Sequence, residues 1–250
     1  MNNYKSATNA SVKSVVKQTI ASEIAEGNYV VTLTKPVIIS ALGAIPKPDS
    51  TEVRLIHDCS RLPGQTINDY ISTCSFKFQT LDDAVKLLKP SYFMAKIDLR
   101  HAYRSVPIHP SNFAATGVKW QFEGGDEFTY FYDTRLPFGA KSSPEILHRR
   151  MMARRAFDSV VVYLDDFLVI APTQQACQLA YSTLLQLPQD LGFSISWRKV
   201  VGPTQKLVFL GVEMDTKQCT MALPPNKHAD LHEVVCKFLT KRRATKQQLQ

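Results

Sequence analysis

The chain has 250 residues, of which 44% are hydrophobic and 21% charged, a composition typical of a globular protein rather than a disordered or fibrous one. Thirty Lys and Arg against 22 Asp and Glu leave a net charge of +8, which favours a polyanionic partner such as nucleic acid. There is no membrane-spanning stretch, no signal peptide and no CxxC pair among the five cysteines, so we expect no membrane partner and an intracellular protein of the cytoplasm or nucleus with reduced thiols.

The first half of the chain is predicted to alternate helices and strands. Apolar residues at helical spacing predict a helix over 11–25 that ends at Gly27. Short strands are expected over 30–33, 37–42, 52–58 and 93–99, whereas 62–71 has no regular pattern. Thr80 and Asp83 have the spacing of a helix cap, so a further helix is expected to begin there.

The second half is predicted to contain hairpins and longer helices. A hairpin is expected from strands 118–122 and 128–132, and two apolar runs surround an acidic turn over 160–171. Helices are expected over 142–157, over 174–187 and from Lys227 onwards, and a late strand over 208–214. Helices that alternate with mostly hairpin-joined strands favour an α+β fold over a doubly wound parallel sheet.

Three acidic residues follow apolar runs. Asp165 and Asp166 form the acidic turn, which taken alone is most simply an ordinary surface turn. Asp98 ends another apolar strand, so the three carboxylates converge if the two strands are neighbours. Such a cluster repels itself unless divalent cations lie within it, and two Mg²⁺ ions, with Mn²⁺ as an alternative, fit the phosphoryl-transfer chemistry of polymerases and nucleases.

Five motifs occur in one order along the chain: IPKPDSTEVRLIHDCSRLPGQTIND (45–69), FMAKIDLRHAYRSVPIHP (93–110), LPFGAKSSPEI (136–146), YLDD (163–166) and VFLGVEM (208–214). In this order they resemble the fingers and palm of a reverse transcriptase from a retrovirus or long-terminal-repeat retroelement, with DIRS-type transposons as the nearest subgroup. Each motif is modest support by itself, but five in order are strong support. The resemblance covers roughly residues 20–250.

The resemblance implies a right-hand polymerase whose palm is an antiparallel sheet backed by helices. The fingers would come from 1–75 and 105–140, the palm from 76–104 and 141–215, and the start of the thumb or connection from 216–250. The reverse transcriptase domain as a whole would cover about 30–215. Because no RNase H, protease or integrase segment is present, we expect a fragment of a polyprotein or an orphan reading frame.

The resemblance also implies roles for individual residues. Asp98, Asp165 and Asp166 would be the catalytic carboxylates that hold two Mg²⁺ ions, with the carbonyl of Leu99 beside them. Lys199 is a candidate general acid for the departing pyrophosphate. The residues that match nucleotide-contacting positions are Lys47, Arg54, Tyr103, Phe138, Gly139 and Lys141, and those that match primer- or template-contacting positions are Tyr163, Phe209, Leu210 and Gly211.

Among these, Lys47 and Arg54 would neutralise triphosphate charge, although each is also a plausible surface cation. Tyr103 would exclude a ribose 2′-hydroxyl, or be a half-buried core tyrosine. Phe138 and Gly139 would form a tight turn against the nucleotide, at a position where many retroviral enzymes carry Gln. The segment 209–211 would seat the primer end, or be a plain core strand.

The resulting hypothesis is an RNA-directed and DNA-directed DNA polymerase that binds an RNA or DNA primer–template and deoxynucleoside triphosphates; the sequence predicts no oligomeric state. The alternative is an inactive nucleic-acid-binding remnant of a retroelement polyprotein. A nucleotidyl cyclase is disfavoured: residues 124–128 spell GGDEF, as in diguanylate cyclases, but no companion motif occurs. His228, His232 and Cys236 share one helix face, but without a fourth zinc ligand an ordinary amphipathic helix is favoured.

Overall fold

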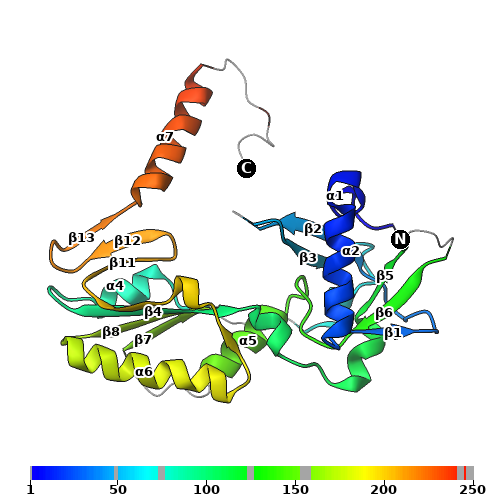
Figure 1. Ribbon diagram of the computed structural model, residues 1–250, viewed down its shortest axis with the longest axis horizontal. Helices are drawn as coiled ribbons and strands as arrows, with labels where there is room; N and C mark the ends of the chain where they lie inside the picture. The colour runs from blue at the N-terminus through cyan, green and yellow to red at the C-terminus, as the bar shows by residue number, and fades with distance from the viewer. Residues whose placement is uncertain are drawn as a thin grey trace. The chain divides into compact units, whose positions relative to one another are not determined.

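The structure is a computed structural model that describes residues 2–47, 50–72, 77–122, 127–152, 159–240 and 245 (Figure 1). The chain forms two compact units. Unit 1 comprises Met1–Phe78, Leu99–Arg154 and Gln189–Ser194, and unit 2 comprises Gln79–Asp98, Arg155–Pro188 and Ile195–Gln250. These units are defined by internal contacts and do not share the boundaries of the expected fingers, palm and thumb, which remain predictions.

Unit 1 contains two small antiparallel sheets and several helices. One sheet has the order β1-β6-β5, formed by Tyr29–Thr32, Thr129–Asp133 and Gly117–Trp120, and the other is the hairpin of β2 (Ala41–Pro46) and β3 (Val53–Asp58). The helices are α1 (Lys5–Thr8), α2 (Ala10–Ala25), α3 (Ile67–Tyr70) and α5 (Ser143–Met152), with the 3₁₀ turns η1 (Ala102–Ser105) and η2 (Pro110–Ala115). Val16 and Ile20 of α2 pack with Leu42, Trp120 and Phe131 in a common core.

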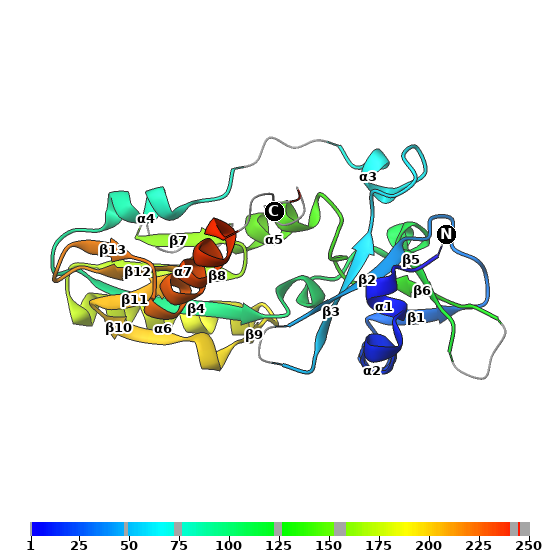
Figure 2. The same cartoon turned by 90° about the horizontal axis from the view of Figure 1, so that it is seen from above.

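Unit 2 is built on an antiparallel sheet of order β10-β4-β8-β7, with β9 (Ser194–Ile195) paired to β4 (Figure 2). Its strands are β4 (Phe93–Arg100), β7 (Val160–Tyr163), β8 (Asp166–Ala171) and β10 (Val201–Thr204). A smaller sheet follows, formed by β11 (Lys206–Phe209), β12 (Val212–Asp215) and β13 (Thr220–Ala222). The helices are α4 (Leu81–Leu87), α6 (Gln174–Asp190) and α7 (Pro225–Leu239), with the 3₁₀ turn η3 (Trp197–Lys199).

The two faces of the main sheet of unit 2 have different neighbours. Helix α6 runs along one face, and α4 lies on the other (Figure 1). On the α4 side, Ala84 packs with Met94 and Leu168 of the main sheet and with Leu207 and Phe209 of the small sheet. Because side chains alternate along a strand, the same face of β4 carries Met94, Lys96 and Asp98 in turn.

Most predicted elements are confirmed, including the helix cap at Thr80, whose backbone N–H donates to Oδ2 of Asp83 at 2.9 Å. The expected strand over 37–42 was misplaced. Its residues form β2 only from Ala41, because the register with β3 fixes the strand and Ile39 makes only an isolated bridge to Gly117. The segment 62–71 contains the short helix α3, capped by Thr66 and Asp69.

The predicted late strand over 208–214 is instead two strands, β11 and β12, joined by a tight turn at Leu210 and Gly211. Both turn residues have positive φ, +46° and +83°, which reverses the chain and forms a hairpin. The fold is α+β, as expected. In the part of the chain that the structure describes, no helix has both the length and the apolar character needed to cross a membrane.

Candidate active site

The carboxylates lie at one end of a sheet face in unit 2. Asp98 of β4 and Asp166 of β8 are direct partners in the antiparallel register, and Tyr163 of β7 is the partner of Asp166 on its other side. The apolar run that ends at Asp98 forms β4 and the run that follows Asp166 forms β8, so the two strands are neighbours, the condition under which the sequence predicted that the carboxylates converge. Asp98 is almost completely buried. The end of this sheet face therefore carries a buried charge, next to the apolar core residues of the same strands.

The turn between β7 and β8 consists of Leu164 and Asp165. Leu164 has φ of +56°, a left-handed conformation that disfavours branched side chains. This two-residue turn places Asp165 next to Asp166 at the end of the hairpin. Strain of this kind is common at functional sites.

Two lysines face the carboxylates. Nζ of Lys199 donates to both oxygens of Asp98 at 3.2 and 3.0 Å, and Nζ of Lys96 lies 3.5 Å from Oδ1 of Asp166. Burial opposes the charge on Lys199, but the hydrogen bond and the negative charge of Asp98 outweigh it, so the pKa of Lys199 is raised. Lys199 therefore keeps its proton at neutral pH.

Asp166 is less well compensated. Its Oδ1 is buried and receives no hydrogen bond, because the contact with Lys96 is too long. Burial, together with the neighbouring charges of Asp98 and Asp165, raises the pKa of Asp166 to about 6 even though Lys96 lowers it. A buried carboxylate oxygen that has only a distant ion pair with Lys96 and no hydrogen bond is an environment that a closer cation would relieve.

The donor chemistry of this site fits a hard divalent cation, because all its candidate ligands are oxygens and Oδ1 of Asp166 is orphaned. Within the described residues, however, no three His, Cys, Asp or Glu side chains are grouped as metal ligands are. The ammonium groups of Lys96 and Lys199 are the cations beside the acids.

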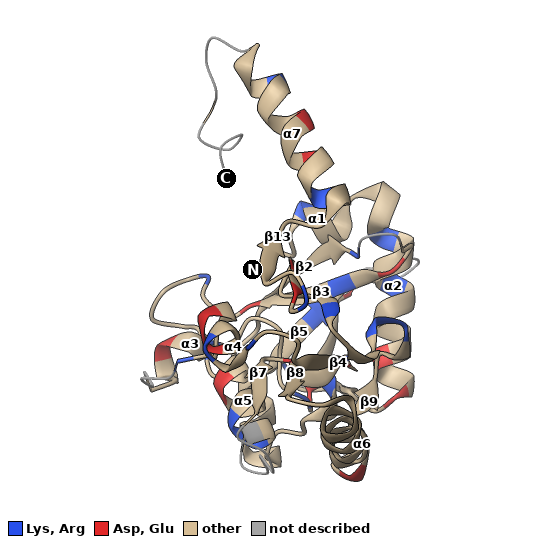
Figure 3. Cartoon of the chain, turned by 90° about the vertical axis from the view of Figure 1, so that its left-hand side faces the viewer, with Lys and Arg blue, Asp and Glu red and all other residues tan. Residues whose placement is uncertain are grey.

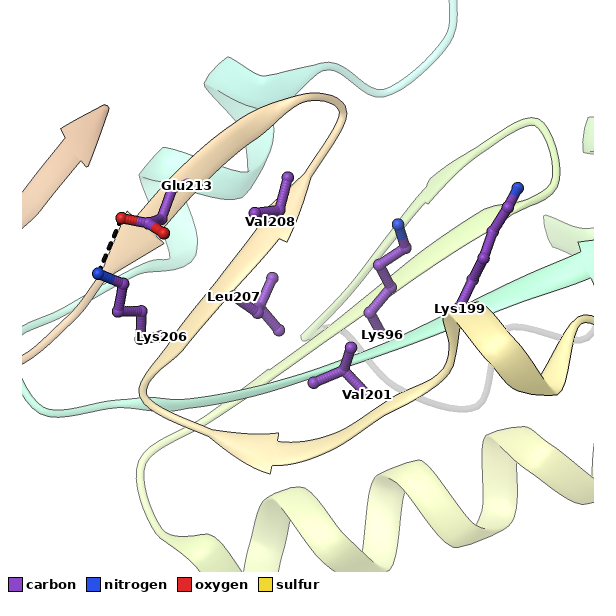
Figure 4. A pocket seen from close by; sticks show the side chains of 7 residues that line it. All are labelled: Lys96, Lys199, Val201, Lys206, Leu207, Val208 and Glu213. Atoms are coloured by element: carbon purple, nitrogen blue, oxygen red, sulfur yellow. Dashed lines mark ion pairs between the residues drawn. The ribbon is translucent and has the colours of Figure 1, made fainter. Parts of the chain in front are cut away.

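An open pocket of about 600 Å³ lies beside Lys96 and Lys199 (Figure 4). Lys96 and Lys199 line one side, Val201, Leu207 and Val208 line the apolar remainder, and Lys206 pairs with Glu213 at 2.8 Å. Both lysines that contact the acids thus also border this space.

The predicted nucleotide-contacting residues lie in unit 1, and three of them contact one another. The ring of Phe138 lies 5.5 Å from the ring of Tyr103 in an edge-on arrangement, and the guanidinium of Arg54 lies 5.2 Å from the same ring. We call Arg54, Tyr103 and Phe138 the aromatic cluster. It combines a cation with two rings, the groups needed to contact a phosphate and a sugar.

The other predicted nucleotide residues are held differently. Lys47 forms an ion pair with Glu52 at 2.6 Å at the end of the β2–β3 hairpin. Gly139 has φ of +145°, and a Cβ there would lie 1.9 Å from the carbonyl oxygen of His57. Lys141 is exposed, and its backbone N–H donates to Oδ1 of Asn68 at 2.8 Å.

The predicted primer-contacting segment is only partly exposed. Phe209 is fully buried in the core of unit 2, so its side chain supports the β11–β12 turn from within and leaves Leu210 and Gly211 at the turn. The segment is therefore a core strand at Phe209 and a half-buried hairpin turn at Leu210 and Gly211.

Helix α7 carries charges of both signs along its described length, including Lys227, Asp230, Glu233 and Lys237 (Figure 3). Lys237 pairs with Glu233, one turn earlier. His232 and Cys236 lie near each other on its exposed surface, but neither they nor His228 belong to a metal-ligand group in the described chain. Gly124, Gly125 and Asp126 of the GGDEF string lie outside the described residues.

A family model described as reverse transcriptase (RNA-dependent DNA polymerase) matches residues 45–214. That range includes all three acids and the whole aromatic cluster. The chain belongs to the reverse transcriptase family.

The chain is similar to parts of retroviral Gag-Pol polyproteins. The chain is 29% identical over 175 residues to the Gag-Pol polyprotein of gibbon ape leukemia virus, which covers 67% of this chain and 10% of the polyprotein. The Gag-Pol polyprotein of avian reticuloendotheliosis virus is 26% identical over 178 residues, 68% of this chain and 15% of that protein. The chain thus spans a small part of the curated relatives it matches.

The fold is shared with solved foamy viral protease–reverse transcriptases. One, in complex with double-stranded DNA, superposes with a TM-score of 0.73 at 19% identity, over 100% of this chain and 39% of the other. Another, in complex with an RNA/DNA hybrid, has a TM-score of 0.71 at 19% identity, over 94% and 29%. This similarity shows that the chain has the fingers-and-palm fold of a reverse transcriptase.

Sequence reasoning overlooked Asn68 in this reverse transcriptase chain. Its Nδ2 donates to the carbonyl of Gly139 at 3.1 Å and to Oγ of Ser60 at 2.8 Å, while its Oδ1 accepts from the N–H of Lys141. Asn68 therefore fixes the turn next to Phe138. Its position in a Gly- and polar-rich loop was the only signal, and it did not identify the partner more than 70 residues away.

Proposed function

We propose that this chain is the fingers and palm of an RNA-directed and DNA-directed DNA polymerase. A primer 3′-hydroxyl attacks the α-phosphate of a deoxynucleoside triphosphate, and pyrophosphate leaves. The observation that carries the proposal is the register pairing of Asp98 with Asp166, which brings a buried and a half-buried carboxylate together at the end of a sheet face. Membership of the reverse transcriptase family supports the same activity.

The carboxylates of Asp98, Asp165 and Asp166, with the carbonyl of Leu99, would hold two Mg²⁺ ions, with Mn²⁺ as an alternative. When bound, these ions neutralise phosphate charge and lower the pKa of the attacking hydroxyl. Lys199 keeps its proton because Asp98 raises its pKa, and it would donate that proton to the departing pyrophosphate.

The aromatic cluster would select the nucleotide. The ring of Tyr103 lies against Phe138, so it is fixed in place and would exclude a ribose 2′-hydroxyl. Arg54, Lys47 and Lys141 would neutralise the triphosphate, and Lys47 would first exchange its partner Glu52 for a phosphate.

The nucleic-acid partner would be an RNA or DNA primer–template, as in the foamy viral relatives that were solved with double-stranded DNA and with an RNA/DNA hybrid. The net charge of +8 supports a polyanionic partner. Tyr163, beside Asp166, and the turn at Leu210 and Gly211 would contact the primer, and the chain would act as part of a polyprotein.

The test is extension of an oligo(dT) primer on poly(rA) with dTTP and Mg²⁺. Wild type is compared with the double variant Asp165→Asn/Asp166→Asn and with Asp82→Asn, which removes an exposed carboxylate of the same unit. We expect extension by wild type and by Asp82→Asn, and none by the double variant.

Equal extension by the double variant would refute the assignment of the acids. Salt-sensitive binding of primer–template without extension by any protein would identify an inactive nucleic-acid-binding remnant instead. A cyclic dinucleotide formed from GTP alone, without primer, would indicate a nucleotidyl cyclase.

A further inference from the structure

A largely buried ionic network adjoins the aromatic cluster in unit 1. It joins α2, β1, β3, η1 and β6 through five side chains, namely Glu23, Tyr29, His57, Arg104 and Asp133. No motif led us to expect it, and the proposed function gives none of these residues a role.

Arg104 is the centre of the network. Its Nη1 donates to both oxygens of Asp133, at 2.9 and 2.7 Å, while its Nε and Nη2 donate to Oε2 of Glu23 at 3.0 and 2.6 Å. Its guanidinium also lies 5.3 Å from the centre of the Tyr29 ring. One planar cation therefore joins two carboxylates from different elements, a geometry that the point charge of lysine does not reproduce.

Asp133 continues the network to His57. Asp133 is completely buried, and its Oδ2 lies 3.6 Å from Nε2 of His57, which in turn lies 2.7 Å from the hydroxyl of Tyr29. The backbone N–H of Arg135 donates to Oδ1 of Asp133 at 3.0 Å. Every carboxylate oxygen of Asp133 is therefore engaged.

The network reaches the aromatic cluster at both ends. Arg104 directly follows Tyr103 in η1, so its position fixes the backbone that carries the Tyr103 ring. The backbone N–H of His57 donates to the carbonyl of Phe138 at 2.9 Å, and the carbonyl of His57 lies where a side chain at Gly139 would be. The spacing between Tyr103 and Phe138 is thus set on one side by Arg104 and on the other by His57.

We propose that Arg104 and Asp133 are positioning residues that set the distance between Tyr103 and Phe138, and so determine deoxynucleotide affinity and the discrimination against ribonucleotides. This inference rests on the proposed function, because it assigns the network a role at the same nucleotide site. It adds that the selectivity of the site depends on the ionic network as well as on the rings of Tyr103 and Phe138.

A purely structural role is the competing explanation. Buried ion pairs are a weak source of stability, since well-packed apolar residues often replace them without loss. They are effective at fixing one geometry, because a charged fork has few satisfactory arrangements. A network that ends on both sides of one ring pair is suited to that second purpose.

The test uses two substitutions that keep side-chain shape. Asp133→Asn removes the charge between Arg104 and His57, and Glu23→Gln removes the outer charge but keeps an acceptor oxygen on helix α2. Ile20→Val, in the core of the same unit, serves as a control whose loss of stability comes from packing alone. Tyr103→Ala serves as the reference for complete loss of discrimination between deoxynucleotides and ribonucleotides.

Each protein is bound to a primer–template with a dideoxy-terminated primer, so that no chemistry occurs, and titrated with dTTP and then UTP in the presence of Mg²⁺. We expect Asp133→Asn to raise the Kd for dTTP about tenfold and to reduce the UTP/dTTP Kd ratio severalfold, with a smaller change for Glu23→Gln. Melting temperatures are measured in parallel. The Ile20→Val variant should have a lower melting temperature than wild type but the same UTP/dTTP Kd ratio.

Suppose that Asp133→Asn folds and keeps the wild-type UTP/dTTP Kd ratio, whereas Tyr103→Ala reduces this ratio. That result would overturn the positioning role but leave the proposed function intact. If Asp133→Asn does not fold, the ratio of Glu23→Gln decides in the same way. A wild type that binds primer–template but not dTTP would overturn the proposed function and this inference with it.

Discussion

Both units bury charged side chains, but they balance those charges differently. In unit 1, the guanidinium of Arg104 satisfies Asp133 and Glu23 with good geometry. In unit 2, Lys199 reaches Asp98, but Oδ1 of Asp166 receives no hydrogen bond. Burial raises the pKa of both Asp133 and Asp166, but both oxygens of Asp133 accept hydrogen bonds, whereas one oxygen of Asp166 accepts none.

This difference separates two uses of a buried carboxylate. A satisfied carboxylate whose partner is itself largely buried fixes geometry, and its removal should damage folding and position. An unsatisfied carboxylate lowers the stability of the folded protein in the absence of ligand. Its removal should therefore damage function but increase stability. The two kinds of carboxylate should therefore respond differently to substitution and to pH.

Substitution of Asp98 by Asn should have the largest effect on function. We expect primer extension to fall about a thousandfold or more, because several kcal/mol of transition-state stabilisation are lost with one carboxylate. Lys199, its partner, is 62% exposed and can be hydrated, so the melting temperature should change little. Single-nucleotide kinetics and thermal melting of the same sample measure both, and a rate near that of wild type would contradict the role of Asp98.

Substitution of Gly139 by Ala should have the largest effect on stability. The new Cβ would meet the carbonyl oxygen of His57, in a backbone conformation that L side chains rarely adopt. We expect a loss of about 3 kcal/mol in the free energy of unfolding, measured with urea. Gly64→Ala is the matched control: Gly64 also has positive φ but faces open space, so only the cost of the backbone, about 1 kcal/mol, should remain. Equal losses would show that the close approach to His57 is unimportant.

Acid should destabilise unit 1 through His57. Burial, reinforced by Arg104, lowers the pKa of His57 to about 3, below its ordinary 6.5, while Glu23 opposes this. The unfolded chain therefore binds a proton first, so the stability that neutral His57 contributes is present above pH 6.5 and is lost as the pH falls towards 3. Between pH 6.5 and 4.5 the loss should be roughly 2–3 kcal/mol. Urea unfolding at both pH values measures it, and His57→Gln should remove this part of the pH dependence; the same slope in both proteins would exclude His57 as its source.

Substitution of Asp166 by Asn should stabilise the metal-free protein. Burial raises the pKa of Asp166 to about 6, above its ordinary 3.8, so the favourable contribution of this group is present below pH 3.8 and is lost as the pH rises through 6. At pH 8 the ionised carboxylate is a cost, and its removal should raise the free energy of unfolding by about 1 kcal/mol.

Added Mg²⁺ supplies the internal control for that variant. It should raise the melting temperature of wild type more than that of Asp166→Asn, because ligand binding to the folded state stabilises it. A lower melting temperature for Asp166→Asn in metal-free buffer would mean that its pairing with Lys96 outweighs the cost of burial.

The sequence predicted the unit 2 site better than the unit 1 site, for a physical reason. Asp98 and Asp166 each end an apolar run, and alternation along a strand is local information that a single sequence carries. Arg104 and Asp133 are polar residues near short strands, and their pairing depends on the packing of α2, η1 and β6. Asn68 was missed for the same reason, since its partners at Gly139 and Lys141 come from a distant loop.

The predicted single strand over 208–214 is wrong, although the segment contains a local signal for a turn. Leu210-Gly211 sits in the middle of the apolar run, and a glycine there permits the positive φ that turns the chain back. The hydrophobic pattern of this run is continuous and by itself predicts one strand. The positive φ angles of Leu210 and Gly211, rather than the hydrophobic pattern, divide this run into two strands.

The antiparallel order β10-β4-β8-β7 has a consequence for synthesis of the chain. β4 pairs with β8, from Asp98 to Asp166, and then with β10, from Met94 to Thr204, so its two neighbours leave the ribosome long after it does. At about 5–20 residues per second, β4 would wait for several seconds as an unpaired apolar strand. Contacts this distant in sequence also slow folding of the released chain. Nascent unit 2 should therefore be the part of this protein that chaperones recognise, and slower translation between β4 and β10 should increase its aggregation.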